Sequence, residues 1–291
     1  MEDEMIIADL QSLHETHEPE STLGEIESWM KSDYNEDSVW VIVEGVDDRK
    51  IYESFFNDNA LVREAADERK RCGCGNLYAI VNTIVDEGFE GIIGIRDTDY
   101  SPYNGLPTNE HVYCTDQHDI EIQMLESAEV QDGIRRKKPQ FSQALNSAYK
   151  TMRFVGYLRA YSVAINCSFS FDKYMKASNL WNQDDKRYVR GWRQKLWNTF
   201  FATESQGEYP APDKQGFCNY VVSHNLRDEP STKLCQGHDV SLFLQWTGAV
   251  TDIYKQFLEY YTYAAFQKSS LHDSIQLWAD KKGYRILIST Q

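Results

Sequence analysis

The sequence predicts an α/β protein in which a parallel sheet flanked by helices precedes a mainly α-helical C-terminal region. Two short runs, VWVIV and GIIGI, are apolar and rich in β-branched residues, which is typical of buried strands. The segments between such runs have helical patterning, and this alternation favours a parallel sheet. Beyond residue 131 the chain contains long amphipathic segments instead, which indicates a helical region.

The first part of the chain is expected to alternate between the two kinds of element. Strands are expected at VWVIVEG (39–45), GIIGIRDTD (91–99) and HVYCTD (111–116). Helices are expected at 23–32, 49–56, around 61–71, at 77–88 with Asn76 as its cap, and at 118–127. We therefore expect an acidic lead-in over 1–36, followed by a sheet domain over 37–130.

The second part, 131–291, is expected to be a mainly helical domain. Its expected helices are 141–162, 180–201, 237–250, 250–266 and 269–287. In the GHD sequence at 237–239, Asp239 is expected to cap the helix that begins there.

Charge is distributed unevenly along the chain, whose formal net charge is −15. Residues 1–130 carry a net −23, residues 131–200 a net +10 and residues 201–291 a net −2. The six cysteines are scattered, no apolar run reaches about 18 residues, and the acidic first twenty residues differ from a secretory signal. These features predict a reduced, cytoplasmic protein with no membrane span.

Acidic side chains follow each of the three expected strands. In parallel sheets, ligands bind outside the carboxyl ends of the strands. Crowded carboxylates destabilise one another, and a hard cation such as Mg²⁺ offsets that cost. The acidic residues at these positions are Glu44, Asp97, Asp99, Asp116, Asp119 and Glu121.

An alternative is that Asp97 and Asp99 are ordinary turn residues, since Asp is common in turns. Together with VEG upstream and HDIE downstream, however, the DTD sequence favours a metal site. Mg²⁺ is the expected cofactor, with Mn²⁺ as the alternative. One or two such ions can activate a water and shield the leaving oxygen of a phosphodiester.

The motifs VEGVDD (43–48) and IRDTDY (95–100) resemble the TOPRIM domain of topoisomerases, bacterial primases and OLD-family nucleases. The resemblance implies a Rossmann-like TOPRIM fold. It also implies that Glu44 is a metal ligand or the general acid/base, and that Asp97 and Asp99 hold Mg²⁺. These three residues are the candidate catalytic set.

A narrower resemblance, through VEGVDDRKIYESFF, GIIGIRDTDY, TDQHDIEIQML and CQGHDVSLFL, is to the AriB-like branch of TOPRIM proteins, the effectors of the PARIS anti-phage system. It implies a toxic nuclease acting on transfer RNA, an ABC-type ATPase partner similar to AriA, and a homodimer. It also implies that Glu121 adds a carboxylate to the metal site, with Asp119 and His118 close by. The chain has no P-loop, so an ATPase activity would belong to the partner.

The basic middle of the chain is the candidate nucleic-acid surface, because phosphates need Lys and Arg and aromatic rings stack on unpaired bases. Two alternatives remain: the aromatics are helix core beside a solvated face, or the patch docks an acidic surface of a second copy or a partner. Lys70 and Arg71 are further candidates for a contact with phosphate. The candidate nucleic-acid-binding residues are Arg135, Arg136, Lys137, Lys138, Lys186, Arg187, Arg190 and Arg193.

The sequence thus predicts a metal-dependent nuclease that cleaves transfer RNA in anti-phage defence. Two rival hypotheses are a DNA nuclease of the OLD type, and a catalytically silent sensor or interaction subunit bound to an ATPase.

Overall fold

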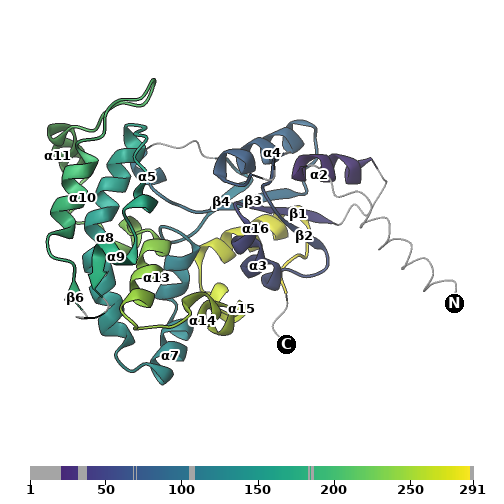
Figure 1. Cartoon of the computed structure of the whole chain (residues 1–291). Helices are drawn as coiled ribbons and strands as arrows, with labels where there is room; N and C mark the ends of the chain where they lie inside the picture. The colour runs from purple at the N-terminus through teal and green to yellow at the C-terminus, as the bar shows by residue number, and fades with distance from the viewer. Residues whose placement is uncertain are drawn as a thin grey trace. The chain divides into compact units, whose positions relative to one another are not determined.

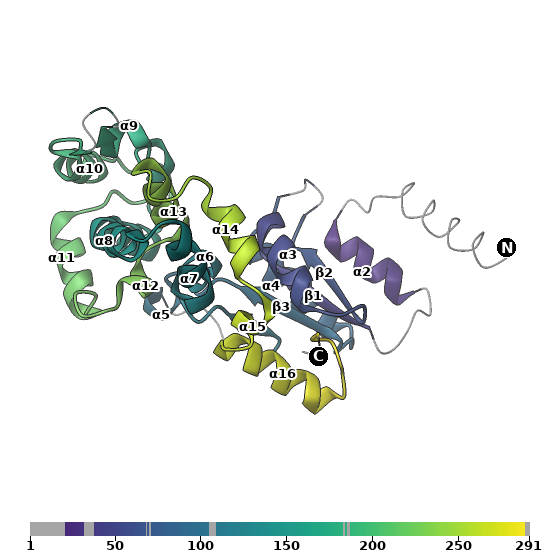
Figure 2. The ribbon, with the colours of Figure 1, turned by 90° about the horizontal axis from the view of Figure 1, so that it is seen from below.

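The computed structural model describes residues 21–31, 38–67, 69, 71–104, 109–182, 184 and 187–288 (Figures 1 and 2). Its contacts divide the chain into two compact units. The sheet unit comprises Met1–Arg96, Asn109–Tyr113 and Ile275–Gln291, and the helical unit comprises Asp97–Thr108 and Cys114–Ser274. This division differs from the predicted boundary at residue 130. The helix Ile120–Glu126, which begins within HDIE, belongs to the helical unit, and its apolar residues Ile122, Met124 and Leu125 are buried.

The sheet unit contains an all-parallel sheet of four strands in the order β2-β1-β3-β4, which confirms the predicted α/β class. β1 pairs with both neighbours, so that Val41 lies opposite Val62 in β2 and Ile93 in β3. The elements are α2 (Thr22–Met30), β1 (Val39–Val43), α3 (Val46–Tyr52), η1 (Glu53–Phe55), β2 (Ala60–Glu64), α4 (Cys74–Asp86), β3 (Ile92–Arg96), β4 (Val112–Cys114) and the C-terminal part of α16 (Ser270–Lys282).

The two central strands, β1 and β3, are buried along their whole length, as expected for strands covered on both faces. On one face, Trp40 packs in a cluster with Leu77 of α4 and Ile26 of α2. Trp29 of α2 meets the edge of Trp40, with the ring centroids 5.7 Å apart. Figure 1 shows α2 and α4 on this side of the sheet and α3 on the other. The ends of β1 and β3 are therefore held firmly side by side.

The prediction of a charged helix at 61–71 is wrong, because Ala60–Glu64 forms strand β2. The apolar residues Leu61 and Val62 pair with β1, and the charged side chain of Arg63 is accommodated by two hydrogen bonds to Glu25 of α2, at 3.0 and 3.2 Å. An edge strand can carry such charges because one of its sides remains open.

The predicted cap of the next helix is also wrong. α4 begins at Cys74, and its N-cap is Gly73, whose φ of 144° favours glycine. The side chain of Asn76 instead donates a hydrogen bond of 2.7 Å to the carbonyl of Arg71.

The helical unit is mainly α-helical, as predicted for the C-terminal region. Its long helix α8 contacts α7, α11, α12 and α13, and Figure 2 shows it nearly end-on among its neighbours. The elements are α5 (Ser101–Asn104), α6 (Ile120–Glu126), α7 (Ala128–Lys137), α8 (Phe141–Ala164), η2 (Phe171–Lys173), α9 (Ala177–Leu180), β5 (Trp181–Asn182), β6 (Arg187–Tyr188), α10 (Trp192–Phe200), α11 (Lys214–Ser223), α12 (Ser231–Leu234), α13 (Gly237–Trp246), α14 (Ile253–Tyr260), α15 (Tyr263–Phe266) and the start of α16.

The single helix predicted over 180–201 is wrong in its first half. There, β5 and β6 form an antiparallel hairpin in which Trp181 lies opposite Tyr188. α10 begins only after Gly191, which has a left-handed φ of 77°. This turn separates the aromatic residues of the hairpin from those of the helix.

Among the described residues, no helix combines the length and apolar character that crossing a membrane requires.

Gly94 offers a test of packing on the α4 face of the sheet. A Cβ at this position would lie 2.7 Å from Leu77 and 3.3 Å from Val112. Gly94→Ala is expected to lower the free energy of unfolding by about 1–3 kcal/mol through overpacking. The matched control is Gly75→Ala in the first turn of α4, where a Cβ meets nothing within 4 Å, so stability should stay equal or rise by up to about 1 kcal/mol. Urea titration of both variants followed by circular dichroism measures the difference, and equal midpoints would contradict the packing argument.

Candidate functional site

Glu44 is the first residue after the buried strand β1, and its side chain is 19% exposed. Its Oε1 lies 3.7 Å from Nε of Arg96, the last residue of β3, whose side chain is only 2% exposed. The guanidinium of Arg96 also lies 5.8 Å from the ring centre of Tyr78. A buried charge is costly unless it is paired, so Glu44 and Arg96 stabilise each other at the strand ends.

Sequence reasoning missed Arg96, although a signal was present. A cation at the last position of an otherwise apolar strand, directly before Asp97, is unusual enough to need a partner. In the parallel register, Val43 pairs with Ile95, so Glu44 and Arg96 are the residues that follow this pair along the chain.

The residues after Glu44 start helix α3. The Gly45 N–H donates a hydrogen bond of 2.9 Å to Asp48 Oδ2, and Asp47 accepts one of 2.8 Å from Lys50. The two aspartates of VEGVDD therefore have roles in the first turn of the helix.

The helical unit contains the DTD turn, and its geometry comes from its backbone contacts. Asp99 has a left-handed φ of 48°, a conformation that Asp tolerates better than most residues. Its N–H donates a hydrogen bond of 2.6 Å to the carbonyl of His118. Thr98 donates two hydrogen bonds to Thr115: its N–H donates to the Thr115 hydroxyl at 3.0 Å, and its hydroxyl donates to the Thr115 carbonyl. The turn is thus fixed against the segment that leads into HDIE.

Asp97 faces the start of α6. Its Oδ1 accepts a hydrogen bond of 3.0 Å from the N–H of Ile120. Asp97 and Asp99 are both partly exposed, so both residues contact solvent. The DTD turn and HDIE, which are about twenty residues apart in sequence, are brought together.

Asp119 is the N-cap of α6, and it is buried. Its Oδ1 accepts a hydrogen bond of 2.8 Å from Ile122 N, and its Oδ2 accepts one of 2.6 Å from Gly237 N. His118 Nδ1 lies 3.0 Å from the same Oδ2. These contacts give Asp119 a role in holding the backbone, and its predicted role as a metal ligand stays a prediction.

His118, next to Asp119, is also a buried polar residue, and its side chain is 1% exposed. Its ring meets Tyr100 edge to face, with the centroids 4.6 Å apart. Within the described residues, His118 Nε2 has no hydrogen-bond partner. Since buried polar atoms are normally satisfied, this nitrogen can accept or donate one further bond.

Glu121 lies partly exposed in the first turn of α6. Its Oε1 accepts a hydrogen bond of 3.1 Å from the hydroxyl of Tyr254, and that hydroxyl lies 3.4 Å from His238 Nδ1. A Cβ on Gly237 would lie 2.4 Å from the Glu121 Cβ, so only glycine allows this close approach. The HDIE and GHD motifs are therefore two halves of one structural feature.

The prediction that Asp239 caps α13 is wrong. Asp239 is 2% exposed and accepts two hydrogen bonds from Arg159 of α8, at 2.9 and 3.1 Å. Burial raises the pKa of Asp239, although the guanidinium of Arg159 opposes that shift. The N-cap residue of α13 is Gln236.

Asp116, the first acidic residue after the third expected strand, has a structural role. Its two carboxylate oxygens accept hydrogen bonds from the N–H groups of Ser270 and Leu271, at 2.7 and 2.9 Å. It therefore caps the start of α16.

The predicted metal-site residues are thus distributed over both units. Asp97, Asp99, Asp119 and Glu121 gather around the start of α6 in the helical unit, and Glu44 belongs to the sheet unit. Among the described residues, no three His, Cys, Asp or Glu side chains form a ready-made metal cage. Mg²⁺ is often bound through one or two carboxylates plus water and substrate phosphates, so partly exposed Asp and Glu oxygens suit its chemistry.

The predicted basic residues lie mostly at the surface of the helical unit. Arg135 is paired with Asp132, and Lys137 donates hydrogen bonds to both oxygens of Glu259, at 2.9 and 3.1 Å. Arg136, Lys138, Arg190 and Arg193 are also exposed. Arg187 lies on β6, and Lys186 lies outside the described residues.

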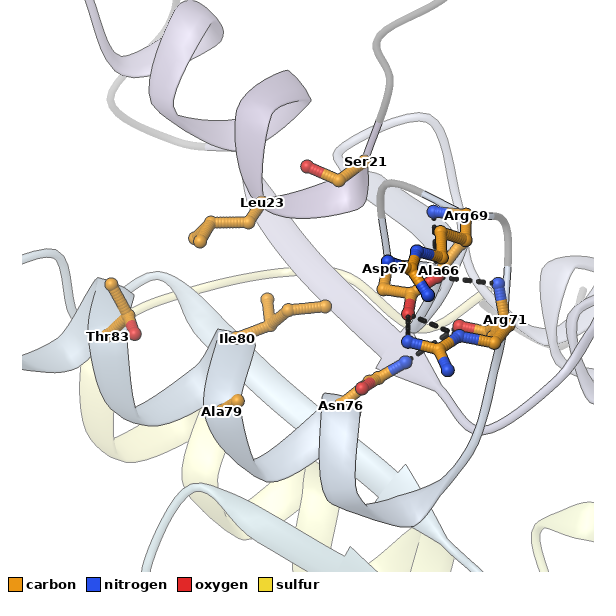
Figure 3. A pocket seen from close by; sticks show the side chains of 10 residues that line it. All are labelled: Ser21, Leu23, Ala66, Asp67, Arg69, Arg71, Asn76, Ala79, Ile80 and Thr83. Carbon is orange, nitrogen blue, oxygen red and sulfur yellow. Dashed lines mark hydrogen bonds and ion pairs between the residues drawn. The ribbon is translucent and has the colours of Figure 1, made fainter.

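The candidate phosphate contact near α4 lines a hollow of about 460 Å³ in the sheet unit (Figure 3). Arg71 donates a hydrogen bond of 2.8 Å to Asp67 Oδ2, and this bond is the main reason why the pKa of Asp67 is below its ordinary value. Lys70 lies outside the described residues. The Arg71 guanidinium is thus already engaged by a carboxylate, and the phosphate contact stays a prediction.

Comparison with known proteins gave no assignment. No protein-family model matches the chain. No curated protein matches it either.

Asp119→Ala is expected to lower the free energy of unfolding by about 1–3 kcal/mol, because it removes the cap of α6 and leaves Gly237 N without its acceptor. Asp119→Asn keeps one carbonyl oxygen and should cost less. Thermal unfolding of the two variants and the wild type gives the ranking. A destabilisation by Asn as large as that by Ala would show that the second oxygen or the charge, not the cap, matters most.

Proposed function

We propose that this chain is a Mg²⁺-dependent TOPRIM nuclease of the AriB-like type, which cleaves transfer RNA as the toxic effector of an anti-phage defence system. One observation supports this most: the DTD turn, which follows a buried parallel strand, is fixed by hydrogen bonds against HDIE and the preceding Thr115.

The parallel register adds support. Val43 of β1 pairs with Ile95 of β3. Glu44 is therefore one residue beyond Val43, and Asp97 is two residues beyond Ile95. Carboxyl ends of neighbouring parallel strands are the usual place for ligands in α/β folds. The pairing of Glu44 with Arg96 keeps the Glu44 carboxylate at this end.

In the proposed mechanism, Asp97 and Asp99 would hold Mg²⁺, and Glu121 with Asp119 would complete the acidic set. The bound cation would lower the pKa of a water and neutralise charge on the phosphate. Glu44 would take the proton of the attacking water as one P–O bond forms, or deliver a proton to the leaving oxygen as the other P–O bond breaks. The basic surface of the helical unit would hold the polyanionic substrate.

As parts of the same proposal, the protein would be cytoplasmic and would form a homodimer. Its partner would be an ABC-type ATPase. The ATPase would keep the nuclease silent until infection.

Induction of the wild type in bacteria is expected to stop growth and to produce discrete transfer-RNA fragments. Glu44→Ala should abolish both effects. The matched control is Asp47→Asn, which removes an exposed carboxylate three residues away and should remain toxic. Fragments that persist in Glu44→Ala would exclude the proposed role of Glu44, and fragmentation of DNA instead of RNA would favour the OLD-type alternative.

The purified wild type should cleave transfer RNA with Mg²⁺ or Mn²⁺ and lose this activity in EDTA. Asp97→Asn and Asp99→Asn are each expected to lower the rate by about 100-fold or more, because each removes a charged ligand of the cation. Rates from gel-resolved time courses over a Mg²⁺ titration test this. Cleavage that continues undiminished in EDTA would contradict the metal dependence, and a complete lack of cleavage and toxicity would favour the silent interaction subunit.

A further inference from the structure

Two predicted basic segments that are about fifty residues apart in sequence meet at one hollow of the helical unit. The hollow has a volume of about 640 Å³, within the range of small-ligand sites. Its lining includes Lys137, Lys138, Phe141, Trp181, Tyr188 and Phe243. Basic groups and aromatic rings therefore lie together here.

A second hollow, of about 390 Å³, shares Tyr188 with the first. Arg190, Trp192 and Arg193 contribute to its lining. Tyr188 thus borders two adjoining depressions, and each of them contains two of the predicted basic residues.

The ring of Tyr188 is held in place but is not covered. It stacks on Phe243 with the centroids 5.8 Å apart and an angle of 18° between the planes, and Trp181 meets it edge to face at 5.5 Å. Its hydroxyl lies 2.7 Å from the Thr151 hydroxyl. Even so, Tyr188 is 38% exposed. A fixed aromatic ring with exposed surface can receive a stacked base without losing conformational freedom on binding.

The charge around the hollows suits a polyanion. Residues 131–200 carry a net +10 in a chain whose total is −15. The exposed ammonium of Lys138 makes no ion pair within the described part of the chain, whereas Lys137 is engaged by Glu259. Phosphates need such cations, and the rings between them suit the bases.

We propose that the hollow around Tyr188 binds an unpaired nucleotide of the RNA substrate, with its base against Tyr188 and its phosphates near Lys138 and Arg190. This inference rests on the proposed function and specifies where the substrate is held. A duplex keeps its bases stacked inside the helix, so the occupant must come from a loop or a single strand.

Binding of the full-length Asp97→Asn protein to labelled RNA in EDTA tests the hollow without cleavage. The two probes are a hairpin with a single-stranded loop and a fully paired duplex of equal length, with Kd measured by fluorescence anisotropy. Adding Tyr188→Ala should weaken hairpin binding about tenfold and leave duplex binding within twofold, while Tyr188→Phe keeps the ring and should bind as the parent does. Lys138→Gln should lower the salt dependence of binding, and the exposed Lys214→Gln, which lies outside both hollows, should weaken binding less than Lys138→Gln does.

A second readout does not depend on the fold of the Tyr188 and Lys138 variants. A 2-aminopurine in the loop should change its fluorescence when the parent protein binds, and the same base in the duplex should not. Hairpin binding that is unchanged in Tyr188→Ala, or an unchanged 2-aminopurine signal at saturation, would overturn the inference. If the wild-type protein cleaves RNA but these results are negative, only the binding of a base in the hollow is refuted. If the base is bound but no RNA is ever cleaved, the nuclease proposal fails and the binding role of the hollow is supported.

Discussion

The carboxylate of Asp119 accepts hydrogen bonds from α6 and from the start of α13, and the acidic set of the helical unit depends on it. Its Oδ1 holds Ile122 N, its Oδ2 holds Gly237 N, and His118 contacts the same carboxylate. Because Gly237 has no side chain, it can approach so closely that Glu121 lies beside it. HDIE and GHD therefore form one unit of structure, although more than a hundred residues separate them.

Much of the sheet unit could be predicted from local patterns. The runs VWVIV and GIIGI are apolar because both faces of these central strands are covered, and short apolar runs give a clear signal. ALVRE gives a weak one, because an edge strand alternates with charges that also suit a helix. Only its pairing with β1, and the bonds from Arg63 to Glu25, explain why it is a strand. These are contacts between distant residues, which periodicity cannot show.

The acidic residues show the same limit. Sequence could place Glu44, Asp97 and Asp99 after strands, because strand ends follow from local hydrophobicity. It could not assign Asp116 to the cap of α16, or Asp239 to a buried pair with Arg159, because their partners come from far along the chain. It also missed Arg96 and Tyr188, whose importance depends on what surrounds them in space.

Asp99 and Asp119 differ in a way that bears on how such a protein can evolve. The backbone of Asp99 adopts a left-handed φ of 48°, which Gly or Asn can also adopt, and its bond to His118 uses only the main chain. The backbone conformation at residue 99 and its bond to His118 therefore do not themselves require a carboxylate. At Asp119 the two side-chain oxygens themselves hold the backbone of two helices. Across descendants of this chain, the backbone at residue 99 is compatible with Gly, Asn or Asp, whereas residue 119 is restricted by folding to a side chain that offers two acceptor oxygens.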